Sequence, residues 1–217
     1  MFKFGAYGDG NRQFKNPSNV IFNRKTNQLV VSDSINHRIQ IFGDKGIFIS
    51  KFGREGAGNG ELRYPRGVAV DKEGNYLVAD ENNHRIQVFD SSGNFLRKFG
   101  SEGTGNGQLK EPIGIGLLSN ENIVVSEWGN HRLQIFTPQG QFVSLIGVGM
   151  LKDPFRLCVD SEDHIYVADY SNKRILVFLP NGQLVKTLKT GELKPRGVCV
   201  DDEGRIIVCG AHEVLIF

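Results

Sequence analysis

Short apolar runs separated by polar turns recur along the whole chain. The stretch SDSINHRIQIF (32–42) returns as ADENNHRIQVF (79–89), SEWGNHRLQIF (126–136) and ADYSNKRILVF (168–178), and a shorter version, VLIF, ends at Phe217. The equivalent phenylalanines are 47, 47, 42 and 39 residues apart, an interval typical of propeller blades and of helical arrays. The chain is therefore built from four copies of one repeat and a shorter fifth copy.

The residue types in each repeat decide between strands and helices. The second repeat contains the runs RGVAVD, YLVAD, RIQVF and NFLRKFG, which are rich in Val, Ile and Phe and are bounded by Gly, Pro, Asn and Asp. Such runs are typical of strands, and no repeat offers ten residues of helical periodicity. Four antiparallel strands in each repeat predict a propeller blade. The predicted fold is all-β, a propeller of five four-stranded blades that forms a single domain over residues 1–217.

The two ends of the chain have complementary sequences. The last repeat stops after its third strand, and the chain begins with FKFG (2–5), which matches the fourth-strand sequences SKFG (50–53) and RKFG (97–100). We therefore expect the N-terminal strand to join the C-terminal blade and close the ring. Closure would remove the open sheet edges that otherwise promote aggregation.

The repeated motif resembles that of a known family. NHRIQVF, with YPRGVAVD before it and GNFLRKFG after it, resembles the NHL repeat, and the resemblance extends over essentially all 217 residues. Loops such as FGSEGTGNGQL are most similar to the C-terminal NHL propeller of TRIM-NHL proteins. Those propellers usually have six blades, so either this ring is smaller or a further blade lies upstream. The complementary ends favour the smaller ring.

An acidic residue and an arginine recur five positions apart in the repeated turn. The pairs are Asp33 with Arg38, Asp80 with Arg85, Glu127 with Arg132, and Asp169 with Arg174. In the fifth repeat both partners are lost together, because Gly210 and Glu213 take their places and the turn is two residues shorter. This joint loss predicts that the partners interact, within one blade or between neighbouring blades, and fix the geometry of the turn. We favour this structural role over direct contact with a ligand.

Composition limits the classes of partner. The chain is 39% hydrophobic and 23% charged with a net charge of +2, which is ordinary for a soluble globular protein. Binding of nucleic acid would therefore depend on local charge. No apolar run approaches the ~20 residues that span a bilayer, and the N-terminus lacks a secretory signal. The three cysteines fit neither a full disulfide framework nor a zinc pattern, which favours a reducing, cytoplasmic setting.

Neither metal binding nor catalysis has a convincing set of residues. His37, His84 and His131 recur because the whole turn recurs, and Lys173 stands in their place in the fourth repeat. The glycine-rich loops GAGNGE and GTGNGQ do not lead into a helix, as phosphate-cradling loops do. We expect no enzymatic activity, cofactor, metal ion, membrane or DNA partner.

Basic and aromatic residues gather near the proline that opens each repeat and in the turn after its second strand. In a propeller these segments lie on one face, where ligand-binding residues are common. The candidate RNA-binding residues are Arg63, Tyr64, Arg66, Lys110, Trp128, Lys152, Phe155, Arg156, Tyr170, Lys194 and Arg196. Cations that contact phosphates and aromatic rings that stack on unpaired bases are what recognition of single-stranded RNA uses. Asn82 or Asn130 would contact base edges.

These residues predict a non-catalytic module that binds short single-stranded or hairpin RNA as part of post-transcriptional regulation. The resemblance supports this prediction, since several TRIM-NHL propellers bind RNA through this face. Others bind proteins, and the alternative is a protein–protein interaction platform that recruits substrates for a TRIM-type ubiquitin ligase. RNA binding requires a strongly positive face, whereas a peptide platform would present an apolar or mixed patch. Lysines near strand ends also keep β-proteins soluble, a purely structural explanation.

Overall fold

The computed structural model describes residues 3–217 and consists almost entirely of strands and turns. It forms two compact units, the first ending at Glu102 and the second spanning Gly103–Phe217. The helical segments described are short 3-10 turns, and none within residues 3–217 has the length and apolarity needed to cross a membrane.

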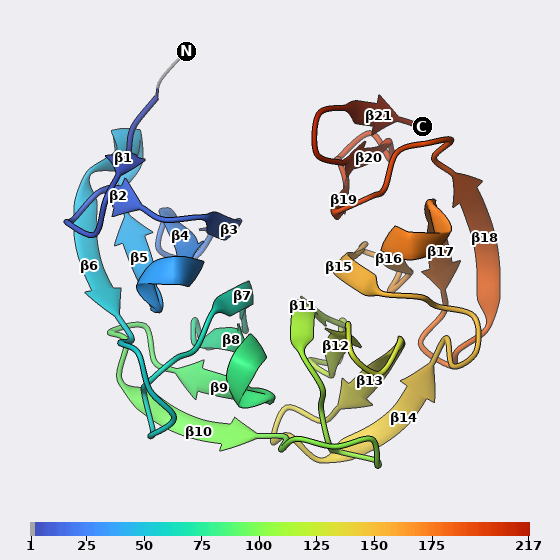
Figure 1. Cartoon of the computed structure of the whole chain (residues 1–217), viewed down its shortest axis with the longest axis horizontal. Helices are drawn as coiled ribbons and strands as arrows, with labels where there is room; N and C mark the ends of the chain where they lie inside the picture. The colour runs from blue at the N-terminus through green and yellow to red at the C-terminus, as the bar shows by residue number, and fades with distance from the viewer. Residues whose placement is uncertain (1–2) are drawn as a thin grey trace. The chain divides into compact units, whose positions relative to one another are not determined.

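The first unit contains two four-stranded blades whose strands follow one another in sequence order (Figure 1). Blade one consists of β3 (Pro17–Asn23), β4 (Gln28–Asp33), β5 (Arg38–Phe42) and β6 (Phe48–Phe52). Blade two consists of β7 (Pro65–Val70), β8 (Tyr76–Asp80), β9 (Arg85–Phe89) and β10 (Phe95–Phe99). The 3-10 turns η1 (Ser34–Asn36) and η3 (Glu81–Asn83) join the second strand to the third, and η2 (Asp44–Gly46) joins β5 to β6. A short parallel pair, β1 (Ala6–Tyr7) and β2 (Gln13–Phe14), precedes blade one.

The second unit contains three blades. Blade three consists of β11 (Pro112–Leu117), β12 (Ile123–Glu127), β13 (Arg132–Phe136) and β14 (Phe142–Ile146). Blade four consists of β15 (Pro154–Val159), β16 (Ile165–Asp169), the turn η4 (Tyr170–Asn172), β17 (Arg174–Phe178) and β18 (Leu184–Lys189). Blade five consists of β19 (Gly197–Val200), β20 (Ile206–Cys209) and β21 (Val214–Ile216). The predicted all-β fold of five propeller blades is confirmed.

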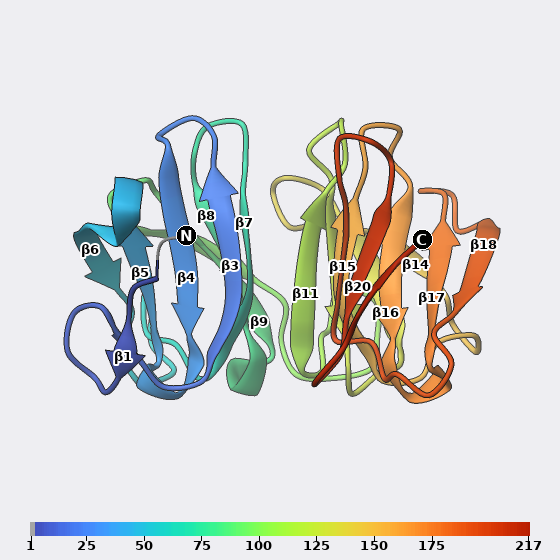
Figure 2. The ribbon, with the colours of Figure 1, turned by 90° about the horizontal axis from the view of Figure 1, so that it is seen from above.

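Apolar side chains between successive blades form the core of each unit. In the first unit, Val30 and Ile39 of blade one pack with Tyr76 and Phe89 of blade two. In the second unit, blades three and four share one cluster, and blades four and five share another. The third strands of blades one to three also bury a central glutamine, which hydrogen-bonds to the acidic residue that ends the second strand: Gln40, Gln87 and Gln134. Figure 2 shows the strands of each unit running between loops at their two ends.

A proline begins the first strand of blades one to four and pairs with the acidic residue that ends the second strand. Proline suits this position because it has no N–H to donate to the sheet. The residue before it has a left-handed backbone, with φ of 50–53° at Asn16, Tyr64, Glu111 and Asp153. This conformation is uncommon for residues other than glycine, and it turns the chain sharply into each blade. Blade five lacks this residue, since Lys194 directly precedes Pro195.

The predicted closing strand is not confirmed. Among the residues described, the last sheet has three strands, and residues 3–5 of the FKFG sequence belong to no strand; Phe2 lies outside the described residues. The ring of Phe4 packs against Phe14 and Phe42, with centroids 6.3 and 4.9 Å apart. It also covers Gly46, where a Cβ would lie 2.4 Å from it.

Blade two has the same arrangement, since Phe52 of SKFG packs on Phe89 at 4.6 Å and covers Gly93. The repeated KFG sequence therefore marks a contact with the blade that follows it. In FKFG this contact is made with blade one, which explains the sequence match without pairing to the last blade.

We expect Phe4→Ala to lower the thermal midpoint of the protein. Phe4 is half-buried, so the loss should be about 2 kcal/mol, below the ~3–5 kcal/mol of a fully buried phenylalanine. A chain of this size would then melt roughly 4–8 °C lower. Thermal unfolding followed by circular dichroism measures this shift. Tyr7→Ala is the control, because Tyr7 is 84% exposed; equal midpoints for the two variants would contradict the packing role of Phe4.

Candidate nucleic-acid interface

Each of the first four blades holds the turn after its second strand with a buried ion pair. The Nε–H of the arginine donates to the carboxylate five residues earlier, at 2.8 Å for Arg38 and Asp33 and at 2.7 Å in the other three blades. All four acidic residues are fully buried. The four predicted pairs are thus formed, and each lies within one blade rather than between neighbours.

The pair also holds the loop that connects each blade to the one before it. In blade two, the guanidinium of Arg85 donates to the main-chain carbonyls of Ala57, Gly58 and Glu61 at 2.7–2.8 Å. Asp80 accepts the main-chain N–H of Arg63 at 2.6 Å and the amide of Asn83 at 2.9 Å. We call this set of acid, arginine and asparagine the acid–arginine clamp. Charge-assisted hydrogen bonds of this kind are short and strong, so the clamp fixes the position of the connecting loop.

The clamp weakens in blade four and is absent from blade five. Arg174 has a side chain that is 31% exposed, against 7% for Arg85, and it donates to one loop carbonyl, that of Met150. In blade five Gly210 replaces the acid, and its N–H donates to the main-chain carbonyl of Glu213 at 3.0 Å. The connecting loop before blade five is therefore not tied to its turn by a clamp.

Three predicted site residues lie in the first unit, and they form a mixed patch. Arg63 and Tyr64 are exposed. The ring of Tyr64 meets His37 edge-on at 4.8 Å, and the N–H of Tyr64 donates to His37 Nδ1 at 3.2 Å. Arg66 donates from Nε to Oε2 of Glu81 at 2.6 Å. Glu81 therefore neutralises the charge of Arg66, a pairing that the sequence analysis did not predict.

The repeated histidines stabilise the corners of the following blades. His37 does so for Tyr64, and His131 Nδ1 accepts the N–H of Asp153 at 3.1 Å in the same way. Within residues 3–217, no group of three or more His, Cys, Asp and Glu side chains is placed to hold a metal ion.

In the second unit three predicted aromatic residues form one cluster. Trp128 follows β12, Phe155 lies on β15 and Tyr170 begins η4. Their ring centroids are 5.4–5.9 Å apart, and the rings are tilted or edge-on to one another. All three side chains are partly exposed. This aromatic cluster therefore offers apolar ring surface at the loop end of blades three and four.

Three predicted cations lie against the aromatic cluster. The Lys194 ammonium is 5.3 Å from the Tyr170 centroid, and the Arg196 guanidinium is 6.0 Å from it. The guanidinium of Arg156 is 5.9 Å from the centroid of Phe155. These distances are within the ~6 Å of cation–π contacts. The structure thus brings together six of the predicted residues, while Lys110 and Lys152 are exposed on their connecting loops.

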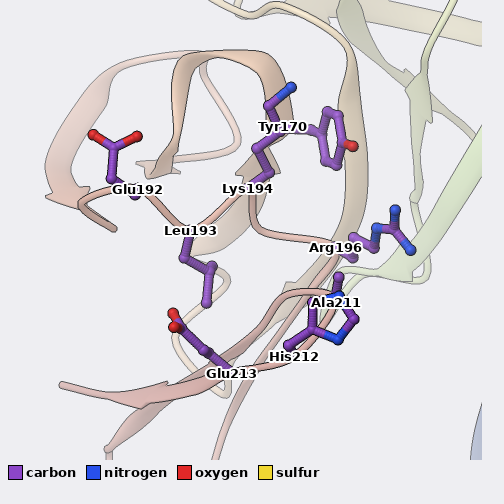
Figure 3. Close-up of a pocket in the computed structure, with 8 residues that line it drawn as sticks. All are labelled: Tyr170, Glu192, Leu193, Lys194, Arg196, Ala211, His212 and Glu213. Atoms are coloured by element: carbon purple, nitrogen blue, oxygen red, sulfur yellow. The ribbon is translucent and has the colours of Figure 1, made fainter.

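A pocket of about 320 Å³ adjoins the cluster in blades four and five (Figure 3). It is lined by Tyr170, Glu192, Leu193, Lys194, Arg196, Ala211, His212 and Glu213. We call it the blade-five pocket. Five of these residues were missed by sequence reasoning, although the joint loss of acid and arginine in the fifth repeat signalled that this turn differs. Without clamp side chains, the shortened turn leaves the space open.

Comparison with known proteins accounts for the repeats. The family described as NHL repeat matches residues 62–89, 109–136 and 151–178. The chain contains three NHL repeats within its β-propeller fold. Each matched NHL segment begins just before a proline corner and ends with a third strand, so it includes one complete acid–arginine clamp.

One curated relative is similar to part of the chain. A stretch of 68 residues is 46% identical to Protein brain tumor of Drosophila melanogaster. This stretch is 31% of the chain and only 6% of that protein. The similarity is therefore limited to a small part of the relative's length.

Solved structures with low sequence identity share the fold. A streptogramin B lyase superimposes with a TM-score of 0.73 at 14% identity, over 93% of this chain and 68% of that one. A catalytically inactive virginiamycin B lyase from Staphylococcus aureus with quinupristin gives 0.72 at 14% identity, over 97% and 70%. At this identity the likeness concerns the fold alone.

The two asparagines expected to contact base edges differ in their surroundings. The amide of Asn130 donates to Glu127 and to the carbonyl of Gly103, so it belongs to the clamp of its NHL repeat. The amide N–H groups of Asn130 are therefore engaged in the clamp, and its contact with base edges stays a prediction. Asn82 is exposed, with its main-chain N–H donating to the carbonyl of Arg63.

Proposed function

We propose that this propeller is a non-catalytic, cytoplasmic module that binds short single-stranded or hairpin RNA in post-transcriptional regulation. The observation that carries the proposal is the aromatic cluster of Trp128, Phe155 and Tyr170 with three cations against it. In the same unit Lys110 and Lys152 are exposed and supply further contacts, and in the first unit Arg63 and Tyr64 are exposed as well.

The physical basis is the combination of ring surface and positive charge in one place. Stacking of an unpaired base on an aromatic side chain contributes about 1–3 kcal/mol, and basic side chains nearby attract the phosphates that link the bases. The net charge of the whole chain is only +2, too small to attract polyanions non-specifically. The grouping of Arg156, Lys194 and Arg196 in one place therefore supports binding of an anionic partner at that site.

A second candidate is a protein-interaction platform, such as one that recruits substrates for a TRIM-type ubiquitin ligase. The first unit favours it, because Arg66 is paired with Glu81 and Tyr64 packs on His37. A mixed patch of this kind suits a peptide better than a polyanion. The fold likeness to bacterial lyases adds no catalytic residue to either proposal.

Selection from a randomised pool of short RNAs tests the proposal. We expect enrichment of one motif, with affinity that falls steeply as salt concentration rises, because phosphate contacts release counterions. A pool of peptides screened in parallel is the control for the alternative. Enrichment of peptides without enrichment of RNA would overturn the proposal in favour of the protein platform.

A further inference from the structure

Blade five differs from the other blades at one main-chain N–H group. In blades one to four the N–H of the residue two positions before the proline donates to the acid of the clamp. The bonds run from Lys15 to Asp33, Arg63 to Asp80, Lys110 to Glu127 and Lys152 to Asp169, at 2.6–3.0 Å. Blade five is one residue shorter here, so Lys194 follows Leu193 as Arg63 follows Leu62 but directly precedes the proline, and Gly210 replaces the acid. Within residues 3–217 no protein group accepts the N–H of Lys194.

The neighbouring side chains cannot supply the missing carboxylate. A Cβ at Gly210 would lie 2.8 Å from Leu193 and 3.2 Å from the Lys194 carbonyl, so Leu193 packs where an acidic side chain would begin. The ammonium of Lys173 donates a hydrogen bond to the carboxylate of Glu192. This hydrogen bond and the positive charge of Lys173 lower the pKa of Glu192. Its charge is therefore already balanced by Lys173.

The charges around the blade-five pocket are segregated. Figure 3 shows Lys194 and Arg196 on the side of Tyr170, with Glu192 and Glu213 on the other side of Leu193. Since Glu192 is paired with Lys173, Lys194 and Arg196 outnumber Glu213 among the remaining fixed charges. The half of the pocket next to the aromatic cluster therefore favours an anion.

We propose that the blade-five pocket binds one phosphate group of the RNA. The N–H of Lys194 donates to a phosphate oxygen in the role that a carboxylate has in the other blades, and the side chains of Lys194 and Arg196 neutralise its charge. Tyr170 then lies beside the attached base. The first four blades have no equivalent subsite, because the corresponding main-chain N–H already donates to the carboxylate of the clamp. This inference rests on the proposed function and adds to it a fixed position for one phosphate.

Amide NMR of the whole chain tests this assignment directly. Inorganic phosphate should shift the Lys194 amide signal saturably, and Arg196→Gln should weaken that binding at least tenfold. With an RNA selected from the pool, Arg196→Gln should reduce the slope of log affinity against log salt by about 0.7, the value for one phosphate of a single strand. Lys186→Gln is the matched control, since Lys186 is an exposed lysine on β18; it should leave the amide shift and the slope unchanged.

The outcomes separate this inference from the proposed function. If RNA binds but neither RNA nor phosphate shifts the Lys194 amide, the phosphate subsite is wrong and the RNA proposal stands. If phosphate shifts Lys194 but the pool contains no ligand, the pocket holds an adventitious ion only, and both proposals are overturned.

Discussion

Asp80→Ala is expected to destabilise the protein by about 3–5 kcal/mol, the usual cost of leaving one partner of a buried ion pair alone. Asp80 is fully buried, and Arg85 beside it is 6% exposed. Removing the carboxylate leaves the buried guanidinium of Arg85 without its counterion and the N–H of Arg63 without its acceptor. The amide of Asn83 keeps only the carbonyl of Gly56 as an acceptor. Urea unfolding followed by fluorescence or circular dichroism gives the change in free energy.

Asp169→Ala in blade four is the matched comparison. Arg174 is more exposed than Arg85 and contacts one loop carbonyl rather than three. Water can therefore solvate the guanidinium that remains, and we expect a loss of about 1–3 kcal/mol. Glu73→Ala, at an exposed turn residue of blade two, should change the free energy of unfolding by less than about 0.5 kcal/mol. Equal losses for Asp80→Ala and Asp169→Ala would contradict the graded clamp.

The sequence predicted the clamp only in part. The five-residue spacing and the joint loss in the fifth repeat identified both partners of every pair. The carbonyls that each arginine binds were not predictable from the sequence. They are main-chain groups 24–29 residues earlier in the chain, and every residue type carries such a carbonyl. The spacing likewise could not show that each pair also fixes a connecting loop.

The candidate site was likewise predictable from the sequence only in part. Repeat alignment placed Trp128 and Tyr170 at equivalent positions, and the structure shows that neighbouring blades bring their rings to 5.4 Å. The neutralisation of Arg66 by Glu81 was missed because the two residues are 15 positions apart and join only when β7 lies beside β8. The prediction from FKFG was not confirmed because the motif makes two kinds of contact. In SKFG the strand pairs within its own blade, and Phe52 packs on the next blade. Sequence identity does not distinguish them.

Tyr170→Ala is expected to weaken RNA binding by roughly 5- to 150-fold, which corresponds to the ~1–3 kcal/mol of one stacked base. The ring of Tyr170 contacts the rings of Trp128 and Phe155, and the cations of Lys194 and Arg196 lie within 5.3–6.0 Å of its centroid. Its removal takes away a stacking surface and also the ring against which both cations are held. Fluorescence anisotropy with an RNA from the selected pool measures the change.

Two controls separate stacking from folding and from charge. Tyr170→Phe keeps the ring and removes the hydroxyl. If Tyr170 acts by stacking, this variant should retain most of the RNA affinity; if Tyr170 acts only through a hydrogen bond from its hydroxyl, the variant should bind RNA as weakly as Tyr170→Ala. Tyr7→Ala removes a highly exposed tyrosine of the first unit and should bind RNA as the unaltered chain does. Because Tyr170 is partly buried against two aromatic rings, its replacement should also lower the unfolding midpoint, by roughly 2–4 °C for each kcal/mol lost, so affinity is compared well below the midpoint of the variant. Unaltered affinity in Tyr170→Ala, with folding intact, would remove the aromatic cluster from the RNA-binding surface and favour a protein partner on this face.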